Sequence, residues 1–220
     1  GAWLLIPSTI TVEIAGYAGL DFAVVDNEQG WFNDETIAEM IRSAENVGMA
    51  LIVRVVANDP GLILKVLNAG ADGIIVPHVK TQADAEAAVR AARYAPEGFR
   101  GQMYAMRRDG YGTIDNREYV AQINREITVM LTIEDVEALD NLDAIASTKG
   151  VDVLVIGRAD LAQSYGVPGH IDDPRILAAE EKIKAAARAN GIAFYGDQII
   201  DAGIDQDLLL HGWMHARQSL

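Results

Sequence analysis

A chain of 220 residues, 50% apolar and 23% charged, has the size of a single domain and enough length for a substantial core. Its formal net charge of −14 argues against nucleic acid and membrane surfaces as partners, because binding either depends on clustered lysine and arginine. With no cysteine for disulfides, thiolate metal sites or a nucleophile, no apolar run of the ~18–20 residues of a membrane span, and no signal peptide at Gly1, we expect a cytoplasmic protein.

Short and almost wholly apolar runs alternate with amphipathic stretches along the chain. Continuous apolar runs are typical of strands that are buried on both faces. The predicted strands are residues 3–6, 22–25, 51–53, 73–76, 127–133, 151–156, 192–195 and 198–200. The predicted helices are residues 34–47, 61–68, 81–94, 114–124, 136–147 and 174–190, with cap signals at Asn33, Thr81 and Gly191.

Repeated strand–helix units predict a parallel sheet, either doubly wound or closed into a barrel. Polar residues follow several predicted strands, at positions 26–29, 54, 77–78, 134–135 and 157–160. A barrel gathers all such strand ends on one face, whereas a doubly wound sheet usually carries a glycine-rich phosphate loop, which this chain lacks. We therefore predict one α/β domain over residues 1–220 with a TIM-like (β/α)8 barrel fold. No helix fits between the last two strands, so either a crossover helix is missing near residue 197 or residues are absent between Asp197 and Gln198.

Two carboxylates follow neighbouring predicted strands. Glu134 comes directly after the strand at 127–133, and Asp160 follows the strand at 151–156. Adjacent parallel strands lie ~4.8 Å apart, so the two side chains can share one cation, and carboxylate oxygens suit Mg²⁺ or Mn²⁺. The alternative is helix capping, because Asp135 and Asp160 both precede plausible helices.

Other polar side chains near the strand ends have both functional and structural interpretations. Arg54 ends an apolar strand, where its guanidinium suits a carboxylate or ketone oxygen, or forms a structural ion pair with Asp26 or Glu28. The turn that begins at Gly157 opens a short helix, whose backbone N–H groups form an anion site. Of the four histidines, we expect most at the surface, and His78 alone follows a strand and faces the site.

A series of motifs, taken in order, resembles the HpcH/HpaI aldolase family, the metal-dependent class II pyruvate aldolases with a phosphoenolpyruvate/pyruvate-type barrel. The likeness runs from residue 1 to about residue 189. Its motifs are LDFAVVDNEQG at 20–30, IVRV at 52–55, GADGIIVP at 70–77, RYAPEGFRG at 93–101, TIE at 132–134 and IGRADL at 156–161.

The resemblance implies a metal site for Mg²⁺, Mn²⁺ or Co²⁺ made by Glu134 and Asp160. It further implies that Arg54 contacts the ketone oxygen of a 2-oxo acid and stabilises its enolate. The substrate carboxylate is expected at the backbone amides of Gly157, Arg158 and Ala159. The resemblance also implies a homo-oligomer, a hexamer or trimer of dimers, in which a C-terminal helix is exchanged between neighbours.

Four positions depart from the family pattern. The catalytic histidine of the D-x-E-H motif is replaced by Gln29, and its orienting aspartate by Asn68. Since glutamine and asparagine do not titrate, the usual proton-transfer pair is absent, although both positions stay candidate catalytic residues. The family's glutamine two residues before the metal glutamate is replaced by Thr132, which we expect to bind substrate. The proline of its G-P-x-D motif is replaced by Arg158, which we expect to bind a second carboxylate or a phosphate on the partner substrate.

These features together predict a metal-dependent carbon–carbon lyase of the aldolase type. It is expected to act on a 2-oxo acid such as pyruvate or oxaloacetate, with an aldehyde as a possible second substrate, through a metal-bound enolate and with atypical proton transfer. Ordinary aldolase turnover should be slow, whereas oxaloacetate decarboxylation or a condensation needs no protein base to form the enolate. The alternative is an oxo-acid-binding pseudoenzyme that keeps the pocket without the turnover.

Overall fold

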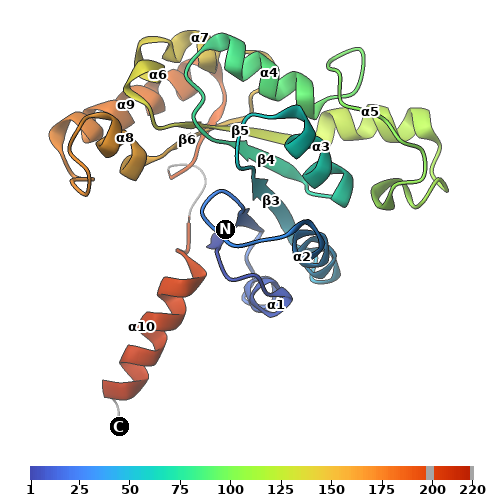
Figure 1. Cartoon of the computed structure of the whole chain (residues 1–220), viewed down its shortest axis with the longest axis horizontal. Helices are drawn as coiled ribbons and strands as arrows, with labels where there is room; N and C mark the ends of the chain where they lie inside the picture. The colour runs from blue at the N-terminus through green and yellow to red at the C-terminus, as the bar shows by residue number, and fades with distance from the viewer. Residues whose placement is uncertain (197–200, 219–220) are drawn as a thin grey trace.

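The computed structural model describes residues 1–196 and 201–218 and shows an α/β fold built on one parallel sheet (Figure 1). Its strands are hydrogen-bonded to one another in chain order, and every pairing is parallel. They are β1 (Ala2–Leu4), β2 (Phe22–Asp26), β3 (Ala50–Arg54), β4 (Gly73–Val76), β5 (Thr128–Ile133), β6 (Val153–Ile156) and β7 (Ala193–Phe194). Because the strands are parallel, their carboxyl ends all lie on the same side of the sheet.

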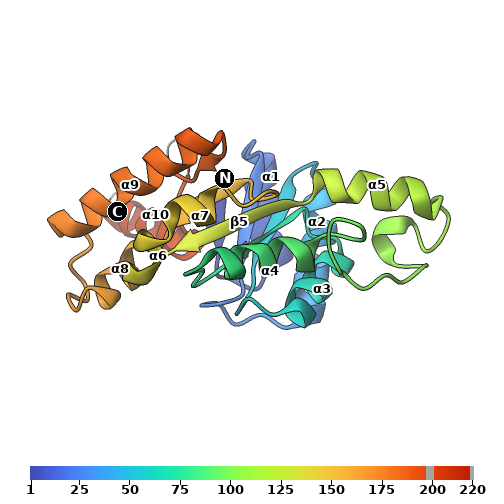
Figure 2. The same ribbon diagram turned by 90° about the horizontal axis from the view of Figure 1, so that it is seen from above.

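The helices of the described part of the chain connect successive strands, except α10, which follows the last of them. They are α1 (Thr9–Tyr17), α2 (Asp34–Asn46), α3 (Pro60–Ala69), α4 (Gln82–Ala92), the 3₁₀ turn η1 (Arg107–Asp109), α5 (Asn116–Glu126), α6 (Val136–Asp140), α7 (Leu142–Ala146), α8 (Arg158–Ser164), α9 (Pro174–Asn190) and α10 (Asp205–Gln218). Both views place α5 and the preceding loop at one end of the molecule and α8 and α9 at the other (Figures 1 and 2). Among these helices none combines the length and the apolar character needed to cross a membrane.

The predicted helix caps are confirmed. The side chain of Asn33 accepts a hydrogen bond from the backbone of Thr36, and Thr81 and Asp84 form a reciprocal capping box at the start of α4. Gly191 ends α9 in the left-handed conformation, with φ of 68°, which glycine adopts without steric cost.

The structure differs from the predicted helices at two places. Helix α1 was not expected, because it exposes Ile10 and Ile14 while burying Val12 and Ala15, so no single apolar stripe marks it in the sequence. The single helix predicted over residues 136–147 is wrong, because the chain forms two short helices that meet at Asn141.

Apolar side chains cover both faces of the sheet, which explains why the strands read as continuous apolar runs. One face packs against the helices, and the other forms a separate cluster that includes Val24, Ile52, Ile75, Met130, Val153 and Val155. The rings of Trp3 on β1 and Tyr195 directly after β7 meet edge to face within this second cluster, 5.9 Å between centroids. Since β1 and β7 are at opposite ends of the strand order, this contact shows that the sheet curls.

A segment preceding α10 lies along the free edge of β1. The backbone N–H of Trp3 donates to the carbonyl of Gly203 (3.0 Å), that of Ala202 donates to Gly1 (2.8 Å), and Trp3 forms a parallel bridge with Ile204. The curled parallel sheet agrees with the predicted TIM-like fold, and closure of an eight-stranded barrel stays a prediction. The strand predicted at 198–200 lies outside the described residues, and between β7 and α10 the described residues hold no helix.

Helix α10 extends away from the rest of the chain (Figure 1). Its first residue, Asp205, is buried and accepts hydrogen bonds from the backbone N–H groups of Leu5 (3.0 Å) and Ile6 (3.1 Å), so the start of the helix is tied to the end of β1. The helix exposes the apolar side chains of Leu208, Leu209, Leu210 and Met214. A surface of this kind is typical of a helix that packs against another chain.

Candidate active site at the carboxyl ends of the strands

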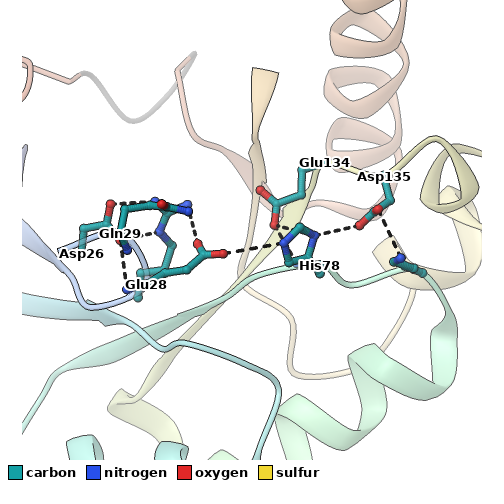
Figure 3. Close-up of polar contacts among 8 residues, drawn as sticks. Asp26, Glu28, Gln29, His78, Glu134 and Asp135 are labelled. Atoms are coloured by element: carbon teal, nitrogen blue, oxygen red, sulfur yellow. Dashed lines mark hydrogen bonds and ion pairs between the residues drawn. The ribbon is translucent and has the colours of Figure 1, made fainter. Parts of the chain in front are cut away.

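Charged side chains from four neighbouring strands gather where those strands end. Asp26 is the last residue of β2, Arg54 the last of β3, His78 is the second residue after β4, and Glu134 comes directly after β5. Figure 3 shows Asp26 and Glu28 on one side of the His78 ring, Asp135 on the other side and the carboxylate of Glu134 above the ring. Strand register therefore brings together residues that are more than one hundred positions apart in the sequence.

Arg54 is held by two carboxylates. Its Nε and Nη2 donate to Oδ1 and Oδ2 of Asp26 at 2.8 and 2.6 Å, and its Nη1 lies 2.9 Å from Oε2 of Glu28. The guanidinium also stacks over the ring of Trp3, 5.0 Å from its centroid. Burial lowers the pKa of Arg54, but its hydrogen bonds with Asp26 and the charges of both acids raise that pKa above its ordinary value, so the side chain stays cationic. Of its five N–H donors two remain for a ligand.

Glu134 is almost completely buried, with 1% of its surface exposed. Its Oε1 accepts the backbone N–H of His78 at 2.7 Å, while its Oε2 is buried without a hydrogen-bond partner. A Cβ atom on Gly157 would lie 2.3 Å from that oxygen, so glycine at this position makes the room that the carboxylate occupies. Burial raises the pKa of Glu134. A buried carboxylate oxygen without a donor fits a cation ligand, because an unpaired buried charge is otherwise costly.

Asp160 lies in the first turn of α8, directly after β6. Burial is the main cause of the raised pKa values of Glu28 and Glu134, and the negative charge of Asp160 raises both further. The cap position of α8 is Gly157, and Asp135 at the start of α6 makes no side-chain cap hydrogen bond. Helix capping therefore does not account for either carboxylate.

His78 lies among three carboxylates. Its Nδ1 is 3.0 Å from Oδ2 of Asp135 and 3.5 Å from Oε1 of Glu134, and its Nε2 is 3.7 Å from Oε1 of Glu28. Lys80 approaches the second oxygen of Asp135 at 3.2 Å. Burial lowers the pKa of His78, but the hydrogen bond with Asp135 and the surrounding negative charges raise it above its ordinary value.

A cavity of about 370 Å³ opens beside these groups. It contains four residues predicted for the site from the sequence: Gln29, Arg54, Thr132 and Gly157. Its other lining residues are Trp3, Leu5, Asp26, Val155, Ile156, Asp201 and Ile204. Thr132 is 1% exposed, and its hydroxyl has no hydrogen-bond partner. A hollow of similar volume between α4 and residues 147–150 brings none of the predicted site residues together.

Asn68 lies elsewhere. It is near the C-terminal end of α3, which leads back to the beginning of β4, and its Oδ1 accepts a hydrogen bond from Nη2 of Arg100 at 2.9 Å. Gln29 follows the carboxyl end of β2, so the two amides lie toward opposite ends of the sheet. Within a single chain the structure does not bring Asn68 to Gln29.

The first turn of α8 carries the other residues predicted to bind substrate. The backbone N–H of Gly157 donates to Ile133 (3.2 Å). The guanidinium of Arg158 is in close ion-pair contact with Glu180 of α9, and Ala159 is exposed. The Arg158 side chain is therefore engaged by the protein itself.

Sequence reasoning missed the roles of Glu28 and Asp135 as partners of His78. The only available signal was position, since all three follow predicted strands. Asp201 was also missed: it lines the cavity, burial raises its pKa, and it belongs to a stretch with no recognisable motif.

Comparisons with known proteins agree with this architecture. The profile of the HpcH/HpaI aldolase/citrate lyase family matches residues 1–213. A 5-keto-4-deoxy-D-glucarate aldolase of Salmonella paratyphi A (strain ATCC 9150 / SARB42) is 37% identical over 191 residues, which are 87% of this chain and 74% of that protein.

Solved structures show the same relationship. An HpcH/HpaI aldolase/citrate lyase family protein from Burkholderia cenocepacia J2315 has a TM-score of 0.94 at 30% identity, covering 100% of this chain and 93% of the other. The citrate synthase SbnG has a TM-score of 0.90 at 32% identity, covering 100% and 91%. Macrophomate synthase has a TM-score of 0.85 at 26% identity, covering 100% and 83%. The chain belongs to the HpcH/HpaI aldolase/citrate lyase family.

Proposed function

We propose that this protein is a metal-dependent carbon–carbon lyase of the aldolase type that acts on a 2-oxo acid such as pyruvate or oxaloacetate. The observation that carries the proposal is the buried carboxylate of Glu134, whose Oε2 has no partner, at the same strand ends as an arginine fixed by two acids. Relatives named as an aldolase and as a citrate synthase support carbon–carbon bond chemistry on this fold.

Glu134 and Asp160 are the residues that hold the cation in this proposal. Both are acidic, both follow neighbouring strands, and the charge of Asp160 contributes to the raised pKa of Glu134. When bound, Mg²⁺, Mn²⁺ or Co²⁺ supplies a Lewis acid for the oxo and carboxylate oxygens of the substrate.

Arg54 donates hydrogen bonds to the oxo oxygen of the substrate in this proposal. Two of its N–H donors are free of the protein, and Asp26 fixes the plane of the guanidinium, so the donors are oriented before substrate binds. A cation in this position stabilises the negative charge that develops on the oxo oxygen as the enolate forms. The hydroxyl of Thr132, buried in the cavity wall without a partner, offers a further hydrogen bond.

The substrate carboxylate is assigned to the beginning of α8. The first N–H groups of a helix have no partner within the helix, so those of Arg158, Ala159 and Asp160 are available for an anion. A second carboxylate on the partner substrate would have to displace Glu180 from the Arg158 guanidinium.

Gln29 restricts the chemistry. It lines the cavity where the family pattern has a histidine, and an amide neither accepts nor releases a proton near neutral pH. Oxaloacetate decarboxylation suits such a site: the bond between the methylene carbon and the terminal carboxylate breaks, CO₂ leaves, and the electron pair becomes the enolate of pyruvate. Water then returns one proton to carbon, so no protein base is required.

The proposal is tested by measuring the decarboxylation of oxaloacetate and the cleavage of an aldol, for which a 4-hydroxy-2-oxo acid is suitable. We expect activity with Mg²⁺ or Mn²⁺, loss of that activity with EDTA, and at least a 100-fold decrease for Glu134→Gln and for Arg54→Lys. Arg42→Lys, in an exposed ion pair on α2, is the matched control. Activity that survives chelation and the Glu134→Gln change would contradict the proposal.

A second candidate is a ligand-binding pseudoenzyme, which the position of Gln29 in the cavity favours. Calorimetry with pyruvate or oxaloacetate, with and without Mn²⁺, distinguishes the two. Metal-dependent binding without turnover of any 2-oxo acid supports the binding protein.

We further propose a homo-oligomer, as the family resemblance implies, in which α10 packs on a neighbouring chain. The exposed Leu208 and Leu210 support this role. Light scattering after gel filtration should give a hexamer for the unaltered protein and a smaller species for Leu208→Glu/Leu210→Glu.

A further inference from the structure

We propose that His78 is a nitrogen ligand of the cation that Glu134 binds, so that this site prefers Co²⁺ or Zn²⁺ over Mg²⁺. The inference rests on the proposed metal-dependent function and adds a ligand to the expected pair of carboxylates. It concerns the segment that follows β4, which lies beside the carboxyl end of β5.

The first argument is the convergence of donor atoms. Glu28, His78 and Glu134 each offer one ligand atom, and the three atoms lie within 4.8 Å of one another. Two donors that share a cation at ~2.1 Å each are separated by no more than ~4.2 Å. The 3.7 Å between Nε2 of His78 and Oε1 of Glu28 is within this limit. Figure 3 shows the imidazole ring beside both carboxylates, with that of Glu28 to its left and that of Glu134 above it.

The second argument is the tautomer that Asp135 selects. Its carboxylate lies 3.0 Å from Nδ1 of His78 and can only accept, so in the neutral ring the proton belongs on Nδ1 and Nε2 keeps the lone pair that a metal requires. Lys80 holds the other oxygen of Asp135 at 3.2 Å and fixes the carboxylate in turn. A carboxylate that orients a histidine from behind is the usual outer support of a metal-bound imidazole.

The third argument is the excess of negative over positive charge among the side chains of the site. Glu134 is buried, and its Oε2 has no hydrogen-bond partner, so this oxygen is available to bind a cation. Carboxylates also outnumber the permanent cations at these strand ends: they are Asp26, Glu28, Glu134, Asp135 and Asp160, against Arg54 and Lys80.

The fourth argument is the backbone of His78. Its φ of 53° lies in the left-handed region, which residues other than glycine seldom adopt. In this conformation the backbone N–H of His78 donates to Oε1 of Glu134 at 2.7 Å. One residue thus fixes an oxygen of Glu134 through its main chain and holds its ring beside that carboxylate, with Nδ1 3.5 Å from Oε1 and Nε2 directed toward Glu28. Unfavourable backbone geometry that is retained in this way is common at binding sites.

An imidazole ligand changes which metals the site favours. Carboxylate oxygens alone suit Mg²⁺ and Mn²⁺, whereas a nitrogen donor adds affinity for later transition metals such as Co²⁺ and Zn²⁺. The presence of His78 should therefore be visible in the ratio of metal affinities, independently of any catalytic rate.

Pulsed electron paramagnetic resonance of bound Mn²⁺ tests the inference directly. The metal-stripped full chain loaded with Mn²⁺ should show modulation from a directly bonded ¹⁴N nucleus. The modulation should disappear in His78→Gln and persist in His170→Gln, a control at an exposed histidine. In calorimetry, His78→Gln should weaken Co²⁺ binding at least tenfold and Mg²⁺ binding less than threefold.

The result for the unaltered protein decides the matter even if a variant fails to fold. Bound Mn²⁺ without ¹⁴N modulation, or an equal loss of Co²⁺ and Mg²⁺ affinity in His78→Gln, overturns the inference. The proposed function survives either result provided that Glu134→Gln abolishes Mn²⁺ binding. If Glu134→Gln binds Mn²⁺ as tightly as the unaltered protein, the metal-dependent function itself fails.

Discussion

The carboxylate of Asp26 and the guanidinium of Arg54 form a two-point contact across β2 and β3, at 2.8 and 2.6 Å. The two residues are direct partners in the strand register, and only 4% and 12% of their side chains are exposed. Asp26 Oδ1 also accepts the backbone N–H groups of Glu28 and Gln29, each at 3.2 Å. One carboxylate therefore fixes both the arginine and the loop that carries Gln29.

Asp26→Asn should lower both stability and activity. Removing the Asp26 charge leaves the buried Arg54 with Glu28 as its one remaining acidic partner and costs about 3 kcal/mol, and the loosened Arg54 should reduce kcat/KM by about 100-fold. Urea denaturation and steady-state kinetics measure the two effects. Glu39→Gln removes an exposed ion pair with Arg42 and should cost less than ~1 kcal/mol. Equal losses for the two variants would show that burial of the Asp26 pair is unimportant.

Gly157→Ala should weaken metal binding without unfolding the protein. The new Cβ atom would lie 2.3 Å from Oε2 of Glu134, so the carboxylate must move. We expect at least a tenfold loss of Mn²⁺ affinity in calorimetry, because the ligand is displaced. Gly212→Ala on α10 meets no atom within 4 Å and serves as the control. Unchanged Mn²⁺ affinity in Gly157→Ala would remove Glu134 from the metal site.

The stability of the metal-free protein should depend on pH through Glu134. Burial raises the pKa of this carboxyl above its ordinary value of 4.5, so the folded state holds the proton more tightly than the unfolded state. The resulting stabilisation is present below pH 4.5 and is lost as the pH rises through the raised pKa. Denaturation in EDTA should therefore show the unaltered protein losing stability relative to Glu134→Gln across this range. A difference that is constant with pH contradicts the prediction.

Added Mn²⁺ should reverse this trend. A cation requires the ionised carboxylate, so metal affinity should rise with pH over the same range. The same denaturation series with saturating Mn²⁺ provides the comparison.

Thr132→Val should separate binding from folding. The threonine hydroxyl is buried without a partner, so its replacement by a methyl group should leave stability unchanged or raise it by about 1 kcal/mol, while KM for the 2-oxo acid increases. Thr148→Val is the contrasting control, because its hydroxyl donates to the carbonyl of Ala144 at 3.0 Å and its loss should cost about 1 kcal/mol. An unchanged KM in Thr132→Val would exclude Thr132 from substrate contact.

Gln29→His should increase aldol cleavage by about tenfold or more, because a titratable group is restored at the cavity wall. Asn68→Asp alone should have little effect in an isolated chain, since Asn68 bonds to Arg100 away from Gln29. Cleavage of a 4-hydroxy-2-oxo acid by both single variants and by the double variant measures these contributions. Failure of Gln29→His to raise the rate would show that the absent histidine does not limit turnover.

The sequence by itself was sufficient for the parallel sheet and for much of the cavity. A strand buried on both faces must be apolar throughout, and parallel strands must end on one side, so the positions of Arg54 and Gly157 could be predicted from local patterns. Thr132, inside β5, was expected in the site only through the family resemblance. The same local reasoning missed α1, whose apolar residues occupy more than one face, and the break at Asn141.

Only the tertiary structure decided which of these side chains meet. The simultaneous pairing of Arg54 with Asp26 and Glu28 depends on strand register and loop geometry. The approach of His78 to Glu134 depends on a left-handed backbone conformation at His78, which no sequence pattern predicts. The separation of Asn68 from Gln29 follows from the direction in which α3 returns along the sheet. Local sequence specifies periodicity and strand ends, whereas contacts between side chains are set by distances through space that sequence spacing does not encode.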